Sequence, residues 1–167
     1  IEASEAGQKN IEAIAISSYN KDSKEVDSRF VNLKIIDGNK FIFFSNYNSP
    51  KSVAFNSFEQ ISALFYWSSV NVQIKMKAKI QKTSSKYNQE YFEKRSLDKN
   101  ALAISSNQSQ EINSYDRVLL EYNDVKNNQD LTICPDYWGG FSFTPYYFEF
   151  WQGHDFRLNK RTAYINF

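Results

Sequence analysis

Residues 70–82, "VNVQIKMKAKIQK", are the segment of this 167-residue chain that best predicts its fold. Side chains on a β-strand point alternately to opposite faces. One face would carry Val70, Val72, Ile74, Met76, Ala78 and Ile80, and the other would carry Asn71, Gln73, Lys75, Lys77, Lys79 and Gln81. This alternation predicts a strand that covers an apolar core on one side and meets solvent on the other.

The segments before and after this strand predict a mainly β protein. Further strands are expected at 11–19, 29–36, 41–46 and 61–67 and, near the end of the chain, at 137–145, 146–152 and 156–167. Asp37-Gly38 marks a hairpin turn between the second and third of these strands. Helices are expected at 49–58, 85–96, 98–106 and 114–127. The pattern favours an antiparallel β-barrel or curved sheet with flanking helices.

Length and composition narrow the class of protein. The length suits a single domain over residues 1–167. The helix-like start "IEASEAGQKN" suggests that the N-terminal end is incomplete, and we expect the C-terminal end to be incomplete as well. The net charge of +1 argues against nucleic-acid binding. The single Cys134 excludes an internal disulfide. The sequence contains no cluster of cysteines of the kind that binds a structural metal ion. No apolar run is long enough to span a membrane. We therefore expect a cytoplasmic protein.

Two groups of side chains are candidates for binding an anion. If 156–167 is a strand, Arg157, Asn159 and Arg161 project from one face. Tyr91 and Arg95 are four residues apart, so they share a helix face on which a phenol lies beside a guanidinium. Taken alone, the second pair is more typical of a solvated helix face with a half-buried Tyr.

Other segments carry weaker indications. "RFVNLK" (29–34) presents cations on both faces of a strand, as an edge strand or the wall of a ligand site would. "SNYNSPK" (45–51) leads into a helix whose N-terminus favours phosphate, although any strand-to-helix turn has a similar composition. The single His154 has neither the partners of a metal ligand nor those of a hydrolytic triad.

Taken in order, these segments resemble the pyridoxamine 5′-phosphate oxidase family over residues 11–165. The matching segments are "RFVNLK" (29–34), "FFSNYNSPK" (43–51), "VQIKMKAKIQK" (72–82), "YFEKRSLDKNALAISSNQS" (91–109) and "WGGF…FEFWQGHDFRLNKR" (138–141 and 148–161). The last of these is the most specific. The resemblance implies an FMN-binding split β-barrel that forms a homodimer with the flavin at the subunit interface. It also implies oxidation of pyridoxamine or pyridoxine 5′-phosphate to pyridoxal 5′-phosphate by O₂, with release of H₂O₂.

The resemblance also implies two sets of site residues. The cofactor-binding set is Arg29, Phe30, Val31, Asn32, Leu33, Lys34, Phe44, Ser45, Pro50, Lys51, Gln73, Gln108, Ser109, Trp151 and Arg161. The substrate-binding set is Lys34, Tyr91, Arg95, Lys99, Arg157 and Asn159, of which Arg157 and Asn159 would be catalytic. Guanidinium and ammonium groups suit phosphate and the polar edge of a flavin. The flavin itself would carry the redox chemistry.

Departures from the family pattern keep alternatives open. Asn159 stands where the family has His, and Lys99 where it has Ser. Pro50 replaces an Arg or similar residue, and Phe44 replaces Tyr. One alternative is a related FMN-dependent oxidase for another ring substrate, of the phenazine-biosynthesis type. Another is a non-catalytic module that binds flavin or pyridoxal phosphate, although a retained substrate clamp argues against it.

Overall fold

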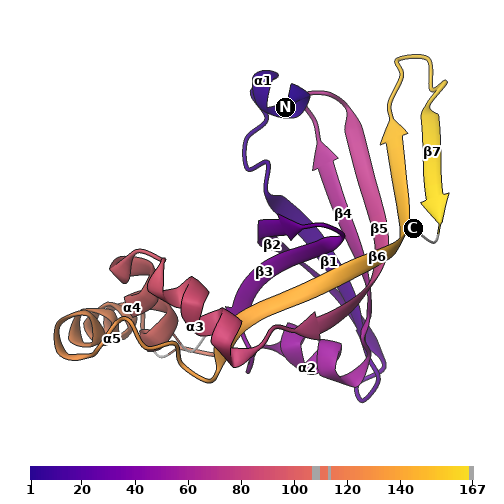
Figure 1. Cartoon of the computed structure of the whole chain (residues 1–167). Helices are drawn as coiled ribbons and strands as arrows, with labels where there is room; N and C mark the ends of the chain where they lie inside the picture. Colours follow the sequence, from indigo (N-terminus) through magenta and orange to yellow (C-terminus); the bar gives the residue numbers. More distant parts are fainter. Residues whose placement is uncertain (107–109, 113, 166–167) are drawn as a thin grey trace. The chain divides into compact units, whose positions relative to one another are not determined.

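A computed structural model describes the chain except residues 107–109, 113 and 166–167 (Figure 1). The chain forms two compact units. The barrel unit comprises Ile1–Phe43, Ala54–Gln81 and the chain from Phe141 onward, and the helical unit comprises Phe44–Val53 and Lys82–Gly140. This division does not test whether either unit folds alone, so the single-domain assignment stays a prediction.

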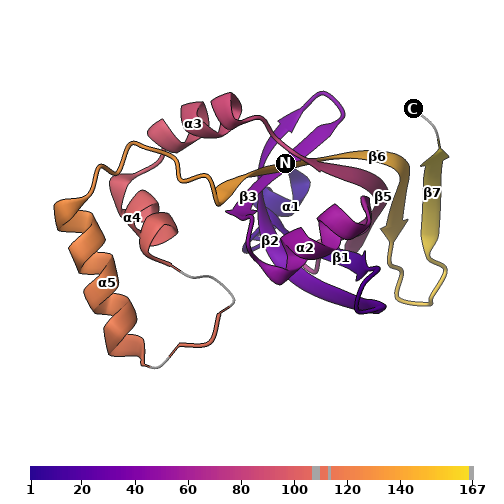
Figure 2. The same ribbon diagram turned by 90° about the horizontal axis from the view of Figure 1, so that it is seen from below.

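The described residues form a seven-stranded sheet, most of which closes into a barrel. The strands are β1 (Ala13–Asn20), β2 (Glu25–Asp37), β3 (Lys40–Asn46), β4 (Gln60–Trp67), β5 (Val72–Lys82), β6 (Trp138–Gln152) and β7 (Lys160–Ile165). Their order is β3-β2-β1-β4-β5-β6-β7, and β3 also pairs with β6. The strands from β3 to β6 therefore form a closed ring, and β7 extends the sheet beyond it (Figure 2). The predicted fold class is confirmed.

Antiparallel pairing follows from the short connections that the sequence predicts. Strand β1 pairs antiparallel with β2 on one side and with β4 on the other. Strands β2 and β3 form a hairpin, and Gly38 in its turn has φ +57°, which glycine adopts without strain. Strand β4 pairs antiparallel with β5, and β6 with β7.

The core of the barrel unit is aliphatic and aromatic. Ile74, Met76, Ala78 and Ile80 of β5 are all buried, which confirms the alternation predicted for this strand. Phe43 stacks on Phe141, with ring centroids 5.6 Å apart. Burying each of these large side chains contributes roughly 1.5–3 kcal/mol to folding.

The helical unit contains most of the helices. They are α3 (Ser85–Glu93), α4 (Leu97–Ser105) and α5 (Tyr115–Asn128); the short α1 (Glu2–Glu5) lies in the barrel unit, and α2 (Pro50–Ser57) runs from the helical unit into the barrel unit. The hydroxyl of Ser84 accepts from Tyr87 N at the start of α3, which confirms the predicted cap. Ser114 caps α5 in the same way, by accepting from Arg117 N. No helix in the described part of the chain is both long and apolar enough to cross a membrane.

Two predictions about the last strands are wrong. Residues 138–152 form one strand, not two. Phe143 and Phe148 are an odd number of residues apart, yet both pack on Phe41. The inward-facing parity therefore changes between Phe143 and Phe148. This stretch contains Pro145, which lacks an N–H for the ladder. The predicted strand 156–167 begins only at Lys160, after a loop.

Candidate functional site

Three predicted flavin contacts lie on one outward face of neighbouring strands in the barrel unit. Gln73 of β5 shares this face with Lys75, because the two residues are two positions apart on one strand. Trp151 of β6 lies opposite Arg161 of β7 in the antiparallel register. Lys75 and Arg161 both contact Glu149 of β6, so the three strands bring the predicted contacts to one surface. We refer to it as the β5–β7 face.

A buried carboxylate lies at the centre of the β5–β7 face. The side chain of Glu149 is 4% exposed, and Lys75 Nζ lies 3.4 Å from its Oε1. Its Oε2 accepts from the Tyr147 hydroxyl over 2.5 Å and from Arg161 Nη2 over 2.6 Å. The hydrogen bond from Tyr147, followed by that from Arg161, holds the pKa of Glu149 at about 2. The carboxylate is therefore ionised at neutral pH and fixes both cations.

The site residues that the family resemblance implies do not include Glu149. The available signal was an acidic side chain inside the aromatic strand "FEFWQ" (148–152). A carboxylate at such a position needs partners from neighbouring strands, because an unpaired buried charge is strongly unfavourable.

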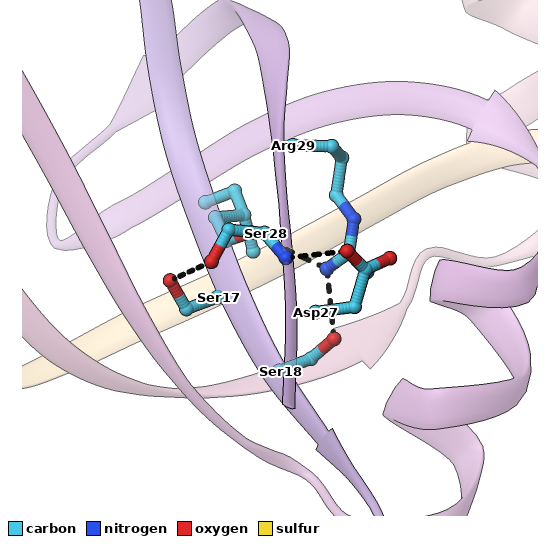
Figure 3. Close-up of polar contacts among 6 residues, drawn as sticks. Ser17, Ser18, Asp27, Ser28 and Arg29 are labelled. Atoms are coloured by element: carbon cyan, nitrogen blue, oxygen red, sulfur yellow. Dashed lines mark hydrogen bonds and ion pairs between the residues drawn. The ribbon is translucent and has the colours of Figure 1, made fainter. Parts of the chain in front are cut away.

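Arg29, a predicted flavin contact, is fixed against the barrel by neighbouring groups (Figure 3). Its Nη1 donates to Ser18 Oγ at 2.8 Å and to the Ile16 carbonyl at 3.3 Å, and its Nη2 lies 2.5 Å from Asp27 Oδ2. A guanidinium has five N–H donors, so these three contacts leave donors for a ligand. The side chain is 18% exposed, so the charge lies near the surface in a fixed direction.

The rest of the predicted segment 29–34 alternates along β2. Phe30, Asn32 and Lys34 are exposed, and Val31 and Leu33 are half-buried. Lys34 Nζ lies 4.0 Å from Glu12 Oε1. The β2–β3 register shifts between Leu33 and Ile35, and such a bulge redirects the side chain at its position, here Lys34. Leu33 and Lys34 also help to line a largely apolar pocket of about 440 Å³ within the barrel unit.

Two predicted substrate contacts meet in the helical unit around Trp138. Tyr91 lies on α3, and its ring stacks on Phe44 with centroids 3.7 Å apart and planes 7° apart. Arg95 follows the end of α3, and its Cζ lies 4.3 Å from the Trp138 ring centroid. The Tyr91 and Trp138 centroids are 6.4 Å apart, so a phenol and a guanidinium lie beside one aromatic surface.

Arg95 is incompletely satisfied. Its Nη2 donates to the Lys99 carbonyl at 3.3 Å, whereas its buried Nη1 has no hydrogen-bond partner among the described residues. Burial lowers the pKa of Arg95, and the neighbouring Tyr91 opposes that shift. Burial also raises the pKa of Tyr91, so its hydroxyl is protonated and can donate at neutral pH. A buried charged donor without a partner is what an anionic ligand would satisfy.

The remaining predicted contacts of the helical unit lie around the start of α2 and on α4. Ser45 is buried and Phe44 half-buried at the end of β3. Pro50 begins α2 and is exposed, and Lys51 after it is half-buried. The side chain of Lys99 is exposed on α4. The predictions for Gln108 and Ser109 lie outside the described residues.

Arg157 and Asn159 do not share a strand face with Arg161, so that prediction is wrong. Residues 153–159 form a loop, in which Arg157 has φ +59° and its N–H donates to the His154 carbonyl. The side-chain oxygen of Asn159 accepts from His154 N at 3.0 Å. The amide at the position of the family's His therefore closes the loop that carries Arg157.

The segment "WGG" (138–140) is explained by close packing in the helical unit. A Cβ on Gly139 would clash with Asn88 Nδ2 and the Tyr47 hydroxyl. Asn88 Oδ1 accepts from Gly140 N at 2.9 Å and from Thr83 Oγ1 at 2.5 Å, and its Nδ2 donates to the Tyr47 hydroxyl at 3.0 Å. This buried polar cluster anchors the segment that contains Trp138.

The chemistry of the described side chains fits FMN and a phosphorylated substrate. The barrel unit offers an amide, an indole and guanidinium groups, and the helical unit offers a phenol beside an unsatisfied guanidinium. Burial raises the pKa of the Cys134 thiol to about 11, so this cysteine is protonated at neutral pH. Among the described residues no group of three or more His, Cys, Asp or Glu side chains could hold a metal ion.

Comparisons with known proteins point in the same direction. Residues 138–166 match the family model "Pyridoxine 5′-phosphate oxidase C-terminal dimerisation region". The chain is 33% identical over 163 residues to pyridoxine/pyridoxamine 5′-phosphate oxidase 1 of Hydrogenovibrio crunogenus, which covers 97% of this chain and 75% of the relative.

Solved structures share the fold. The structure of PhzG from Burkholderia lata, in complex with tetrahydrophenazine-1-carboxylic acid, matches with a TM-score of 0.89 and 22% identity, covering 99% of this chain and 82% of PhzG. A pyridoxamine 5′-phosphate oxidase-related, FMN-binding protein from Nostoc punctiforme matches with a TM-score of 0.73 and 8% identity, covering 98% and 93%.

Proposed function

Because this chain belongs to the pyridoxine/pyridoxamine 5′-phosphate oxidase family, we propose that it is an FMN-dependent oxidase of vitamin B6 phosphates. In the proposed reaction, pyridoxamine or pyridoxine 5′-phosphate is oxidised to pyridoxal 5′-phosphate, and O₂ is reduced to H₂O₂. With the amine substrate, water is consumed and ammonia is released. The observation that carries this proposal is the buried Arg95 Nη1 without a partner, beside Tyr91. A phosphate would accept from both side chains and remove the cost of the unpaired donor.

The barrel unit carries several of the proposed flavin contacts. Arg29 would hold the FMN phosphate through charge-assisted hydrogen bonds. Gln73, Trp151 and Arg161 on the β5–β7 face would contact the ring and its polar edge. Bound FMN supplies the redox chemistry, and the protein places the substrate against it.

The proposed substrate clamp needs no protein nucleophile. The Tyr91 hydroxyl and the unpaired guanidinium N–H groups of Arg95 would donate hydrogen bonds to oxygens of the substrate phosphate. Arg157 would orient the substrate ring from the loop 153–159, in a direction set by its backbone and by the hydrogen bond from His154 N to Asn159. Holding the reacting carbon in one place is itself a large part of catalysis in such a site.

A homodimer is part of the proposal. The family model that matches residues 138–166 is described as a dimerisation region. Within this region β7 pairs with β6, and all six of its residues are exposed. Apolar side chains such as Tyr164 and Ile165, 53% and 68% exposed, are suited to burial against a second copy.

Oxidation of a different ring substrate on the same flavin is the second candidate. The observation that favours it is the side chain of Asn159, whose oxygen is already used by His154 N and which cannot titrate near neutral pH as His does. Its NH₂ group would present a donor only, so the substrate atom that it meets would be an acceptor.

The two candidates are separated by reduction of the flavin without oxygen. The purified chain should be yellow, with about one FMN per subunit, and anaerobic pyridoxamine 5′-phosphate should bleach it. The bleaching step should form pyridoxal 5′-phosphate, and admitting O₂ should then restore the yellow flavin and yield H₂O₂. A colourless chain that ignores added FMN would refute the flavin proposal. A flavin that stays oxidised with pyridoxamine 5′-phosphate, yet is bleached by a dihydro-aromatic carboxylic acid, would favour the second candidate.

A further inference from the structure

Glu149 is the one carboxylate among the buried side chains in the described part of the chain. It lies two residues before Trp151, and the cations that it binds come from two other strands, Lys75 of β5 and Arg161 of β7. The proposed flavin and substrate contacts do not include it. A buried ion pair contributes little net stability compared with an apolar pair of the same size. Its place at the centre of the β5–β7 face therefore requires another reason.

We propose that Glu149 is a positioning residue of the flavin site, which holds Arg161 in the direction that presents its remaining donors beside Trp151. This inference rests on the proposed function. The Arg161 side chain is 61% exposed, whereas the Glu149 side chain is 4% exposed. A long side chain on an exposed strand would sample many rotamers, and the bond to Glu149 Oε2 selects one of them. Arg161 keeps further N–H donors for a ligand.

Tyr147 and Lys75 make this arrangement rigid. The Tyr147 hydroxyl donates to the same Oε2 that Arg161 binds, and Lys75 approaches Oε1. Lys75 and Lys77 also lie over the Tyr147 ring, 5.8 Å and 5.4 Å from its centroid. The carboxylate is thus held from two sides and cannot turn away with Arg161. Support of this kind is what keeps a binding side chain in a productive geometry.

The charge of the cluster also suits an anionic cofactor. Lys75 and Arg161 bind the one carboxylate of Glu149, and Lys77 lies near the Tyr147 ring, so the cluster keeps a net positive charge. The carboxylate itself repels an anion through space. At the ionic strength of a cell, that repulsion is largely screened between groups separated by more than about 8 Å. The orienting effect on Arg161 acts through direct contact and is not screened in the same way.

The test compares Glu149→Gln with Glu59→Gln as a matched control. Glu59 is exposed and lies 3.2 Å from Lys79, an outward residue of the same strand β5. Glutamine keeps the shape of the side chain and can still accept from Tyr147, but it loses the charge that fixes Arg161. The FMN dissociation constant, measured by fluorescence quenching in 0.15 M and 0.5 M salt, should rise about tenfold for Glu149→Gln, which corresponds to roughly 1.4 kcal/mol. Glu59→Gln should bind FMN as the unchanged chain does.

A double substitution separates positioning from a general loss of structure. If Glu149 acts through Arg161, adding Glu149→Gln to Arg161→Gln should weaken FMN binding no further, because effects on one interaction are not additive. Urea unfolding without FMN provides the structural readout. A Glu149→Gln variant that loses stability but binds FMN with wild-type affinity would overturn the inference. A Glu149→Gln variant that binds FMN more tightly than the unchanged chain at the lower salt concentration would also overturn it. An unchanged chain that binds no FMN would instead refute the proposed function.

Discussion

Replacing Arg95 by Met should separate substrate binding from stability. Methionine keeps most of the apolar stem of Arg95 but removes its charge. The protein would lose the contact of the guanidinium with Trp138, at 4.3 Å, which is worth about 0.5–2 kcal/mol. It would also lose the long hydrogen bond of 3.3 Å to the Lys99 carbonyl, worth about 1 kcal/mol or less.

These losses are offset because the substitution also removes the buried Nη1 that has no partner among the described residues. An unsatisfied buried donor costs about 1–3 kcal/mol. The free energy of unfolding of Arg95→Met should therefore stay within about 1 kcal/mol of the unchanged protein. Loss of charge-assisted hydrogen bonds to phosphate, at about 1.5–3 kcal/mol, should weaken ligand binding roughly 10- to 150-fold.

The assay measures both quantities on the same FMN-loaded sample. Urea unfolding followed by circular dichroism gives stability, and quenching of tryptophan fluorescence by pyridoxal 5′-phosphate gives the dissociation constant without turnover. Arg117→Met is the matched control, because Arg117 is 66% exposed and bound to Glu121 on α5. The reasoning fails if Arg95→Met loses more than about 2 kcal/mol of stability while pyridoxal 5′-phosphate binds as before.

Three further outcomes follow from the same structure. Arg157→Ala should lower kcat at least tenfold and leave the FMN dissociation constant unchanged, and equal losses in both would assign this residue to the flavin. Gly139→Ala should lower the free energy of unfolding by about 2–4 kcal/mol in urea, because its Cβ would displace Asn88 from a buried polar cluster. Because its pKa is about 2 in the folded chain against 4.5 ordinarily, ionised Glu149 contributes stability that is complete above pH 4.5 and is lost as the pH falls to 2. The difference in the free energy of unfolding between Glu149→Gln and the unchanged chain should therefore be smaller at pH 2 than at pH 6.

Local patterns predict much of this fold. The alternation in residues 72–82, the Asp37-Gly38 turn and the Ser84 cap each depend on a few adjacent residues, and all three are confirmed. The predicted strand began two residues earlier, at Val70, which lies in the turn before β5. The family motifs add Gln73, Trp151 and Arg161, which lie on the β5–β7 face. They also add Tyr91 and Arg95, which lie beside Trp138.

Features that depend on distant partners were not predictable in the same way. Alternation could not distinguish the loop 153–159 from a strand, because the positive φ of Arg157 leaves no mark in the pattern of polar and apolar residues. The burial of Glu149 depends on cations from two other strands. The change of parity in β6 depends on how Phe143 and Phe148 pack on Phe41.

The outer position of β7 links folding to protein concentration. One edge of this strand is paired with β6, and among the described residues the other edge lies at the end of the sheet order. The edge strand of a sheet exposes backbone N–H and C=O groups with which a strand of another chain can pair. If a second copy covers it, as proposed, then association stabilises the folded chain by mass action. The melting temperature should then rise with protein concentration, and dilute or newly made chains would be the form most exposed to aggregation.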